Sequence, residues 1–321
     1  MLTANVPAIV FEGVTKRFGK VRALQGIDLK VERGELFGFL GPNGAGKTTA
    51  IRLLLDLIRP NDGTVRVFGL DAQRDSLAVR RHIAYLPGDL RLYPRMTARD
   101  YFGLVEDVRG LPIDHEYRQR LVDVLRLDEG RRIGHLSRGN QQKIGVIAAL
   151  MVQPDLLVLD EPTTGLDPLM QETVGELLRE AVSDGCTVFL SSHVLSEVER
   201  MCGRVAMLRE GVVVDTVDLV ERLKLAPQRV VVEFAVPPTR ADLEGIHSAA
   251  LIAFDGVTAT FELQGAVDHL IKWLSHHHVV RLETTAMALD EFFLAYYASG
   301  TAHGSAEEAS IGRSTLAGGG G

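Results

Sequence analysis

The chain has 321 residues, of which 46% are hydrophobic and 24% are charged, and its formal net charge is −7. Such a composition is ordinary for a globular protein with one large domain and a smaller one. The acidic balance argues against non-specific nucleic-acid binding, so we expect no nucleic-acid partner. The two cysteines, Cys186 and Cys202, argue against a disulfide framework and favour a reducing compartment.

The apolar stretches of the chain are too short for the lipid bilayer. The first residues, MLTANVPAIVFEG, lack the basic start and apolar run of a signal peptide. The longest uncharged apolar stretch, IGVIAALMV at residues 144–152, is about half of what a membrane helix needs. We therefore expect any action at a membrane to go through a partner.

In chain order, residues 8–40 carry three strand patterns, which predict an antiparallel edge leading into a buried strand. KTTAIRLLLDLI, residues 47–58, has helical spacing and stops before Pro60. The polar, helical segment at about 90–140 predicts a helical insertion. The strand DLLVLDEP, the helix MQETVGELLREAVSDG and the strand TVFLSSH follow. This alternation predicts an α/β core with a mainly parallel sheet.

The pattern changes near Asp215. Residues 216–298 alternate short strands with helices, from RVVVEFAV to VVRLETTA and a closing LDEFFLAYYA, and predict a small α+β domain. Residues 299–321 are rich in Gly, Ala and Ser without apolar periodicity, which predicts a disordered tail. The predicted division is thus a large domain at 1–215, an accessory domain at 216–298 and the tail.

The stretch GPNGAGKTT fits G-x-x-x-x-G-K-[ST], the phosphate-binding loop, which makes residues 1–215 a predicted nucleotide-binding domain. The loop alone leaves kinases, GTPases and transport ATPases open. It follows an apolar strand and precedes a helix, so backbone N–H groups and the positive helix end meet at one place. We expect Lys47 to reach the β- and γ-phosphates and Thr48 to bind Mg²⁺. The bland alternative is a Gly-rich turn that caps a helix. The predicted nucleotide-binding residues of this loop are Gly41, Pro42, Asn43, Gly44, Ala45, Gly46, Lys47, Thr48 and Thr49.

Two carboxylates end the strand LLVLDEP. Asp160 stands where a carboxylate reaches Mg²⁺ through water, and Glu161 beside it can polarise the attacking water as a general base. The alternative is a solvated acidic turn.

Through these motifs and those that follow, residues 8 to about 215 resemble the ATP-binding cassette family. The family's LSGGQ signature corresponds to LSRGNQQK at 136–143, its D-loop to GLDP with Asp167, and its switch histidine to His193 in SSH. Phe18 takes the place of the aromatic residue that stacks on adenine. The resemblance implies a P-loop ATPase fold that binds ATP and Mg²⁺.

The resemblance also implies partners. Two cassettes, expected to be identical copies, would pair head to tail, so that Ser137 and Gly139 of one face the γ-phosphate bound by the other. His193 would contact that phosphate, and Asp167 would couple the two sites. Separate transmembrane permease subunits would hold the chain at the cytoplasmic face of the membrane. A coupling helix of the permease would dock on LYPRMTARDYF at 92–102.

Two positions depart from the family pattern. Gly88 stands where the family has its Q-loop glutamine, and Asp89 either takes over contact with Mg²⁺ or water, or caps a turn. Arg138 and Asn140 turn the signature into SRGN, and Arg138 either approaches the partner's nucleotide or faces solvent. This signature and the C-terminal unit resemble drug and antibiotic exporter ATPases of the ABC-2 type.

The sequence therefore predicts the ATP-hydrolysing subunit of an ABC-2 exporter of drugs, antibiotics or other lipophilic compounds. The alternative is a non-transport ABC ATPase in repair, translation or assembly. Metal binding by the run His276–His278 is the weaker interpretation, because adjacent residues point in different directions; a polar helix end is preferred.

Overall fold

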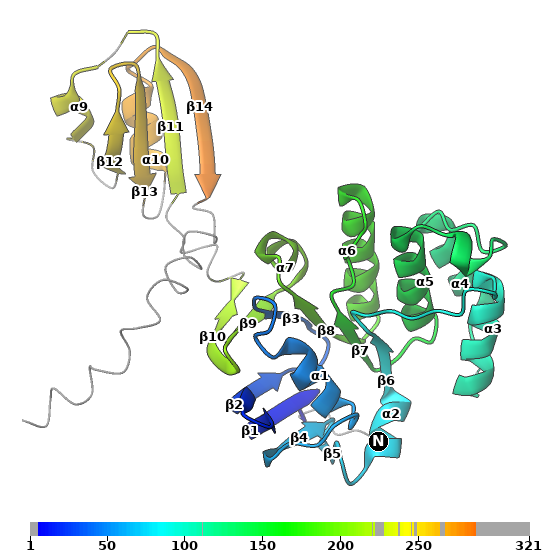
Figure 1. Cartoon of the computed structure of the whole chain (residues 1–321). Helices are drawn as coiled ribbons and strands as arrows, with labels where there is room; N and C mark the ends of the chain where they lie inside the picture. Colours follow the sequence, from blue (N-terminus) through cyan, green and yellow to red (C-terminus); the bar gives the residue numbers. More distant parts are fainter. Residues whose placement is uncertain are drawn as a thin grey trace, which may run out of the picture. The chain divides into compact units, whose positions relative to one another are not determined.

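The structure is a computed structural model, and it describes residues 6–110, 112–219, 221, 228–236, 238–244, 246, 249–263 and 267–286. The chain divides into two compact units, Met1–Val220 and Glu221–Gly321 (Figure 1). The predicted closing segment LDEFFLAYYA and the predicted tail lie outside the described residues.

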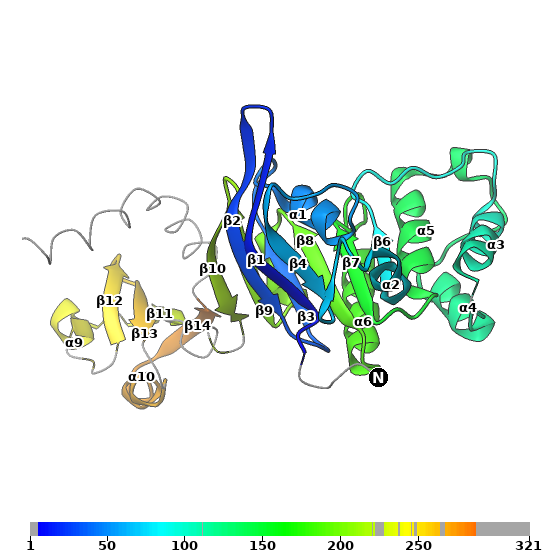
Figure 2. The same ribbon diagram turned by 90° about the horizontal axis from the view of Figure 1, so that it is seen from below.

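The first unit contains an antiparallel sheet with the strand order β2-β1-β4-β5. Its strands are β1 (Ile9–Phe18), β2 (Val21–Val31), β4 (Asp62–Val67) and β5 (Leu70–Asp71). β1 and β2 form a long hairpin that reaches beyond the neighbouring strands (Figure 2). The antiparallel edge expected from residues 8–40 is present, and it adds β4 and β5 from further along the chain.

A second sheet has the order β10-β9-β3-β8-β7-β6. Its strands are β3 (Leu36–Leu40), β6 (Ile83–Leu86), β7 (Leu156–Asp160), β8 (Thr187–Ser192), β9 (Arg204–Arg209) and β10 (Val212–Asp218). All neighbours pair in parallel except β10, which runs antiparallel to β9. Every residue of β3, β7 and β8 is buried, as is usual for parallel strands covered on both faces. The predicted α/β class is confirmed.

The helices of this unit connect and flank the strands. They are α1 (Lys47–Leu54), α2 (Ser76–His82), α3 (Ala98–Arg109), α4 (His115–Val124), the 3₁₀ turn η1 (Ile133–His135), α5 (Arg138–Leu150), α6 (Pro168–Ser183) and α7 (Leu195–Met201). In both views α3, α4 and α5 lie together on one side of the unit (Figures 1 and 2).

The prediction of a helix over residues 47–58 was wrong at its end, because α1 stops at Leu54. Leu55 is the C-cap, and Asp56 then adopts a φ of 50°. A non-glycine residue in the left-handed region breaks the helical hydrogen-bond pattern, so apolar spacing alone overestimated the length.

One hydrophobic core joins the two sheets of the first unit through α1. Phe11 and Ile27 come from the antiparallel sheet, Ile51 from α1, and Phe39 and Phe189 from the six-stranded sheet. The last two rings lie 5.3 Å apart between centroids. Because α1 is buried between the sheets, the loop that precedes it is held at the carboxyl end of β3.

The second unit is a four-stranded antiparallel sheet of order β12-β13-β11-β14, with its own core. Its elements are β11 (Gln228–Phe234), α9 (Arg240–Glu244), β12 (Ala249–Phe254), β13 (Thr258–Leu263), α10 (Asp268–Leu274) and β14 (Val279–Ala286). Phe234, Phe261 and Leu270 are buried in that core, and Trp273 packs against it. The predicted strand-and-helix content of this region is observed.

Both cysteines are buried, and both are free thiols. Burial raises the pKa of the Cys186 thiol to about 12 and also raises the pKa of Cys202. Within the residues that the structure describes, no helix has the length and apolar character required to span a membrane.

Candidate active site

The loop between β3 and α1 leaves no room for side chains at two of its glycines. A Cβ on Gly41 would lie 2.3 Å from the Leu208 carbonyl oxygen, and one on Gly46 would lie 2.6 Å from that of Ala23. Gly46 also has a φ of 113°, which L-residues rarely adopt. The chain therefore turns tightly into α1, and the amides at the start of that helix remain available to an anion.

Lys47 is the first residue of α1, and its ammonium group is buried at the loop. Its Nζ donates to the Gly41 carbonyl oxygen at 2.6 Å and lies 3.6 Å from Glu161 Oε1. Burial lowers the pKa of Lys47, while the charges of Glu161 and Asp160 oppose the shift. A cation held in this way can exchange a carbonyl partner for phosphate oxygens.

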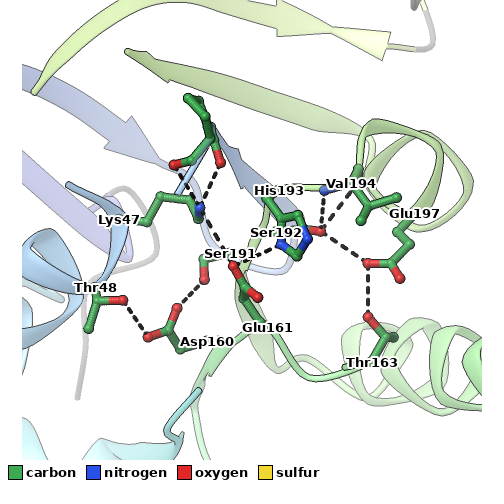
Figure 3. Close-up of polar contacts among 12 residues, drawn as sticks. Lys47, Thr48, Asp160, Glu161, Thr163, Ser191, Ser192, His193, Val194 and Glu197 are labelled. Carbon is green, nitrogen blue, oxygen red and sulfur yellow. Dashed lines mark hydrogen bonds and ion pairs between the residues drawn. The ribbon is translucent and has the colours of Figure 1, made fainter. Parts of the chain in front are cut away.

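Thr48 and Asp160 meet at the carboxyl end of β7 (Figure 3). The Thr48 hydroxyl donates to Asp160 Oδ2 at 2.9 Å, and the Ser191 hydroxyl donates to Oδ1 of the same carboxylate. Asp160 is only 3% exposed. A buried carboxylate beside a hydroxyl is an oxygen donor set of the kind that Mg²⁺ prefers, so these residues fit that ion.

Glu161 and His193 form a second polar pair next to this one (Figure 3). His193 Nδ1 lies 3.0 Å from Glu161 Oε1, and their side chains are 42% and 23% exposed. Glu161 has a φ of 53°, an uncommon value for a non-glycine residue. Its N–H donates to the Ser191 carbonyl oxygen at 3.0 Å, which holds the backbone of Glu161 beside β8.

The segment at 136–143 forms the start of α5, with Ser137 as its N-cap. The Ser137 hydroxyl accepts from the Asn140 N–H at 3.3 Å. A Cβ on Gly139 would lie 2.6 Å from the Gly165 carbonyl oxygen, so the signature and the GLDP turn are in direct backbone contact. Asp167 caps α6 by accepting from the Met170 N–H at 3.0 Å.

Phe18 stands at the end of β1, at the hairpin turn to β2, and is 49% exposed. Lys16 Nζ lies 5.2 Å from the centroid of its ring. An exposed ring at this position is free to stack on a planar ligand.

Comparison with known proteins identifies the family to which this chain belongs. The family model for ABC transporters matches residues 24–164. The Nod factor export ATP-binding protein I of Burkholderia lata is 35% identical over 215 residues, covering 64% of this chain and 69% of that protein. The chain belongs to the ABC transporter ATP-binding proteins.

Two further comparisons extend this. The bacitracin transport ATP-binding protein BcrA of Enterococcus faecalis is 29% identical over 291 residues, covering 88% of this chain and 94% of that protein. A dimeric structure of MJ0796, a bacterial ABC transporter cassette, matches at a TM-score of 0.60 and 25% identity, over 66% of this chain and 98% of that chain. The resemblance drawn from the motifs is confirmed, and this ABC ATPase has transport and export proteins among its relatives.

Gly88, at the position of the family's Q-loop glutamine, brings its backbone close to Asp160. A Cβ on Gly88 would lie 3.3 Å from the Asp160 carbonyl oxygen and 3.4 Å from its carboxylate. The neighbouring Asp89 is 78% exposed and is ion-paired with Arg91 at 2.8 Å. The predicted contact of Asp89 with the metal stays a prediction, and in this structure its carboxylate has a different partner.

Three polar partners of the ABC site were missed from the sequence. Ser191 holds Asp160, and Gln142 Nε2 donates to the Pro162 carbonyl oxygen at 2.9 Å, which ties α5 to the turn after β7. Glu197 accepts from Thr163 and Ser192. Ser191 and Ser192 were visible in SSH, but only as neighbours of the histidine.

The histidine run forms a helix end in the structure. His276 Nδ1 lies 3.0 Å from the Lys272 carbonyl oxygen and His277 Nδ1 lies 3.1 Å from that of Trp273, at the close of α10. Over the described residues, no group of three or more His, Cys, Asp or Glu side chains is arranged to hold a metal ion. The polar helix end agrees with the interpretation that the sequence favoured.

Proposed function

We propose that this ABC ATPase powers an ABC-2 exporter, with drugs, antibiotics or other lipophilic compounds as its cargo. The observation that carries the proposal is the match to the bacitracin transport protein, which spans 88% of this chain and so extends beyond the nucleotide-binding unit. The SRGN signature agrees with that subclass. The alternative, a non-transport ABC ATPase, has no feature of this chain in its favour.

In the proposed reaction, Glu161 is the general base that polarises the attacking water, and Lys47 and His193 stabilise the charge on the γ-phosphate. Lys47 is already a buried cation beside Glu161, so a phosphate arriving there enters a preorganised site. His193 is half exposed next to the base, where it can reach a ligand from the solvent side.

Thr48 and Asp160 would hold Mg²⁺, with Asp160 acting through water. When bound, the ion supplies charge neutralisation on the β- and γ-phosphates. Asp160 is buried and doubly hydrogen-bonded, so its carboxylate is oriented for this task by the protein alone.

The active form in this proposal is a pair of cassettes with ATP between them. Ser137 and Gly139 lie at the N-terminus of α5, where helix amides favour an anion presented by a second copy. Phe18 would stack on adenine, and Asp167 would lie near the facing site. The dimeric solved structure of a related cassette supports the pairing of two cassettes.

We place the permease contact in a groove between α2 and α3. Three large hydrophobic side chains are exposed there, Leu77 (76%), Tyr93 (57%) and Val108 (80%), with Arg80 and Arg81 beside them. An apolar surface rimmed by charge is typical of a protein-binding site. Docking of a permease helix here would hold the chain at the cytoplasmic face of the membrane.

The test is purification of the full chain from membranes, followed by reconstitution of whatever co-purifies into vesicles. We expect permease subunits to accompany the chain and bacitracin to stimulate ATP hydrolysis. A matched preparation with Glu161→Gln should keep the subunits and lose the stimulation. Recovery of the chain without any membrane protein would favour the non-transport alternative.

A further inference from the structure

A buried carboxylate that belongs to none of the sequence motifs lies close to the Glu161–His193 pair. Glu197, in the first turn of α7, is 8% exposed. Its Oε2 accepts from the Thr163 hydroxyl at 2.9 Å and from the Ser192 hydroxyl at 3.0 Å (Figure 3). Thr163 and Ser192 are each 2% exposed. Removing this acceptor would leave the buried Thr163 hydroxyl without this bond and leave Ser192 only its longer bond to the Val194 carbonyl oxygen at 3.4 Å, so the junction is costly to disrupt.

The two donors come from the two segments that carry the pair. Thr163 follows Glu161 by two residues, and Ser192 directly precedes His193. Ser192 Oγ also accepts from the Val194 N–H at 3.0 Å. The backbone on both sides of the histidine is therefore anchored to one hydroxyl, and that hydroxyl is anchored to Glu197.

The Glu161 segment depends on such an anchor. Glu161 holds its positive φ at the start of a turn that closes with the Thr164 N–H donating to the Glu161 carbonyl oxygen at 3.3 Å, and the Leu166 N–H closes the next turn on the Thr163 carbonyl oxygen at 3.0 Å. A residue in a sparsely populated backbone conformation persists only when its surroundings constrain it. The bond from Thr163 to Glu197 supplies one such constraint from outside the turn.

We propose that Glu197 is a positioning residue, which holds His193 and Glu161 at their working separation through Thr163 and Ser192. The inference rests on the catalytic roles proposed above for those two residues. Glu197 touches neither reacting group, and its two hydrogen bonds reach both segments at once. Loss of the junction would let the two segments move independently and would slow the chemical step while leaving the phosphate loop intact.

The experiment compares Glu197→Ala and Glu197→Gln in the full-length chain, with and without His193→Ala. We expect Glu197→Ala to lower kcat on the order of tenfold or more, because small displacements of reacting groups are costly. KM for ATP should change by less than about twofold, since Lys47 and the loop are untouched. Glu197→Gln should recover most of the rate, because its amide oxygen can accept both O–H bonds.

The His193→Ala background separates positioning from mere stability. If Glu197 acts by setting the separation between His193 and Glu161, Glu197→Ala should add less than about a twofold loss once the imidazole is absent. Ser196→Ala, an exposed change on the same helix, is the control and should leave kcat unchanged in both backgrounds.

A second pair of variants covers the case in which Glu197→Ala does not fold. Thr163→Val removes one hydroxyl at nearly constant volume and should lower kcat, whereas Thr163→Ser should restore it. A normal kcat in folded Glu197→Ala and Thr163→Val, with His193→Ala impaired, would overturn this inference alone; so would full additivity with His193→Ala. A normal kcat in His193→Ala would instead remove the proposed role of the histidine, and this inference with it.

Discussion

The two polar pairs of the site differ in how firmly the protein holds them. Asp160 is 3% exposed, and hydroxyls bond to both of its oxygens. The side chains of Glu161 and His193 are 23% and 42% exposed, and Glu161 sits on an uncommon backbone conformation. The pair proposed to bind the metal is thus held at both carboxylate oxygens, whereas the pair proposed to act in hydrolysis is more exposed and can exchange partners. Binding and turnover should therefore respond differently to mutation.

The largest effect is expected from a substitution in the more exposed pair, Glu161 and His193. Glu161→Gln should reduce kcat by about 10²- to 10⁴-fold, the usual contribution of a general base, because the amide cannot accept the proton. ATP affinity should stay near that of the wild type, and a nucleotide-bound dimer should accumulate on size-exclusion chromatography. Turnover close to normal would contradict the assignment.

The next largest effect is expected from a substitution in the buried pair, Thr48 and Asp160. Asp160→Asn should lower kcat by about 10²-fold and raise the Mg²⁺ concentration needed for half-maximal rate, because the site loses its buried negative charge. A Mg²⁺ titration of ATPase activity measures both quantities. An unaltered Mg²⁺ requirement would show that the ion does not depend on this carboxylate.

Ser191→Ala tests the buried pair more gently, because it removes only the hydrogen bond from the Ser191 hydroxyl to Asp160. We expect the Mg²⁺ requirement to rise by about tenfold, in line with the loss of outer-shell hydrogen bonds at other metal sites. Maximal rate at saturating Mg²⁺ should remain within about threefold of the wild type. Ser196→Ala, an exposed serine of α7, is the matched control in the same titration.

The smallest expected effect is that of Asp89→Ala. Because the Asp89 carboxylate is 78% exposed and pairs with Arg91, we expect rate and Mg²⁺ dependence to change by less than about twofold. A large loss would mean that Asp89 leaves Arg91 and approaches the metal when nucleotide binds. The same titration used for Asp160→Asn decides between these outcomes.

The sequence predicted best where local motifs fix geometry. A strand, a Gly-rich turn and a helix in succession determine how Lys47 and Thr48 stand, so the phosphate loop was readable without tertiary information. Asp160 and Glu161 were placed by the end of a buried strand. The α/β class, predicted from the alternation of buried strands and helices, was also confirmed.

The partners of these residues could not be predicted, because they depend on strand register. Ser191 reaches Asp160 since β7 and β8 pair in parallel with these two residues opposite each other. Glu197 meets Thr163 across 34 positions of chain, and only the packing of α7 brings them together. The end of α1 at Leu54 was likewise set by backbone conformation at Asp56 rather than by hydrophobic spacing.

The burial of both native cysteines has a practical consequence. At neutral pH neither Cys186 nor Cys202 carries an appreciable thiolate fraction while the chain is folded, so maleimide reagents should label them slowly. Because Arg138 is exposed, the new thiol of an Arg138→Cys variant should react before either native cysteine. A fluorophore or spin label could then report the approach of two cassettes without any cysteine-free background.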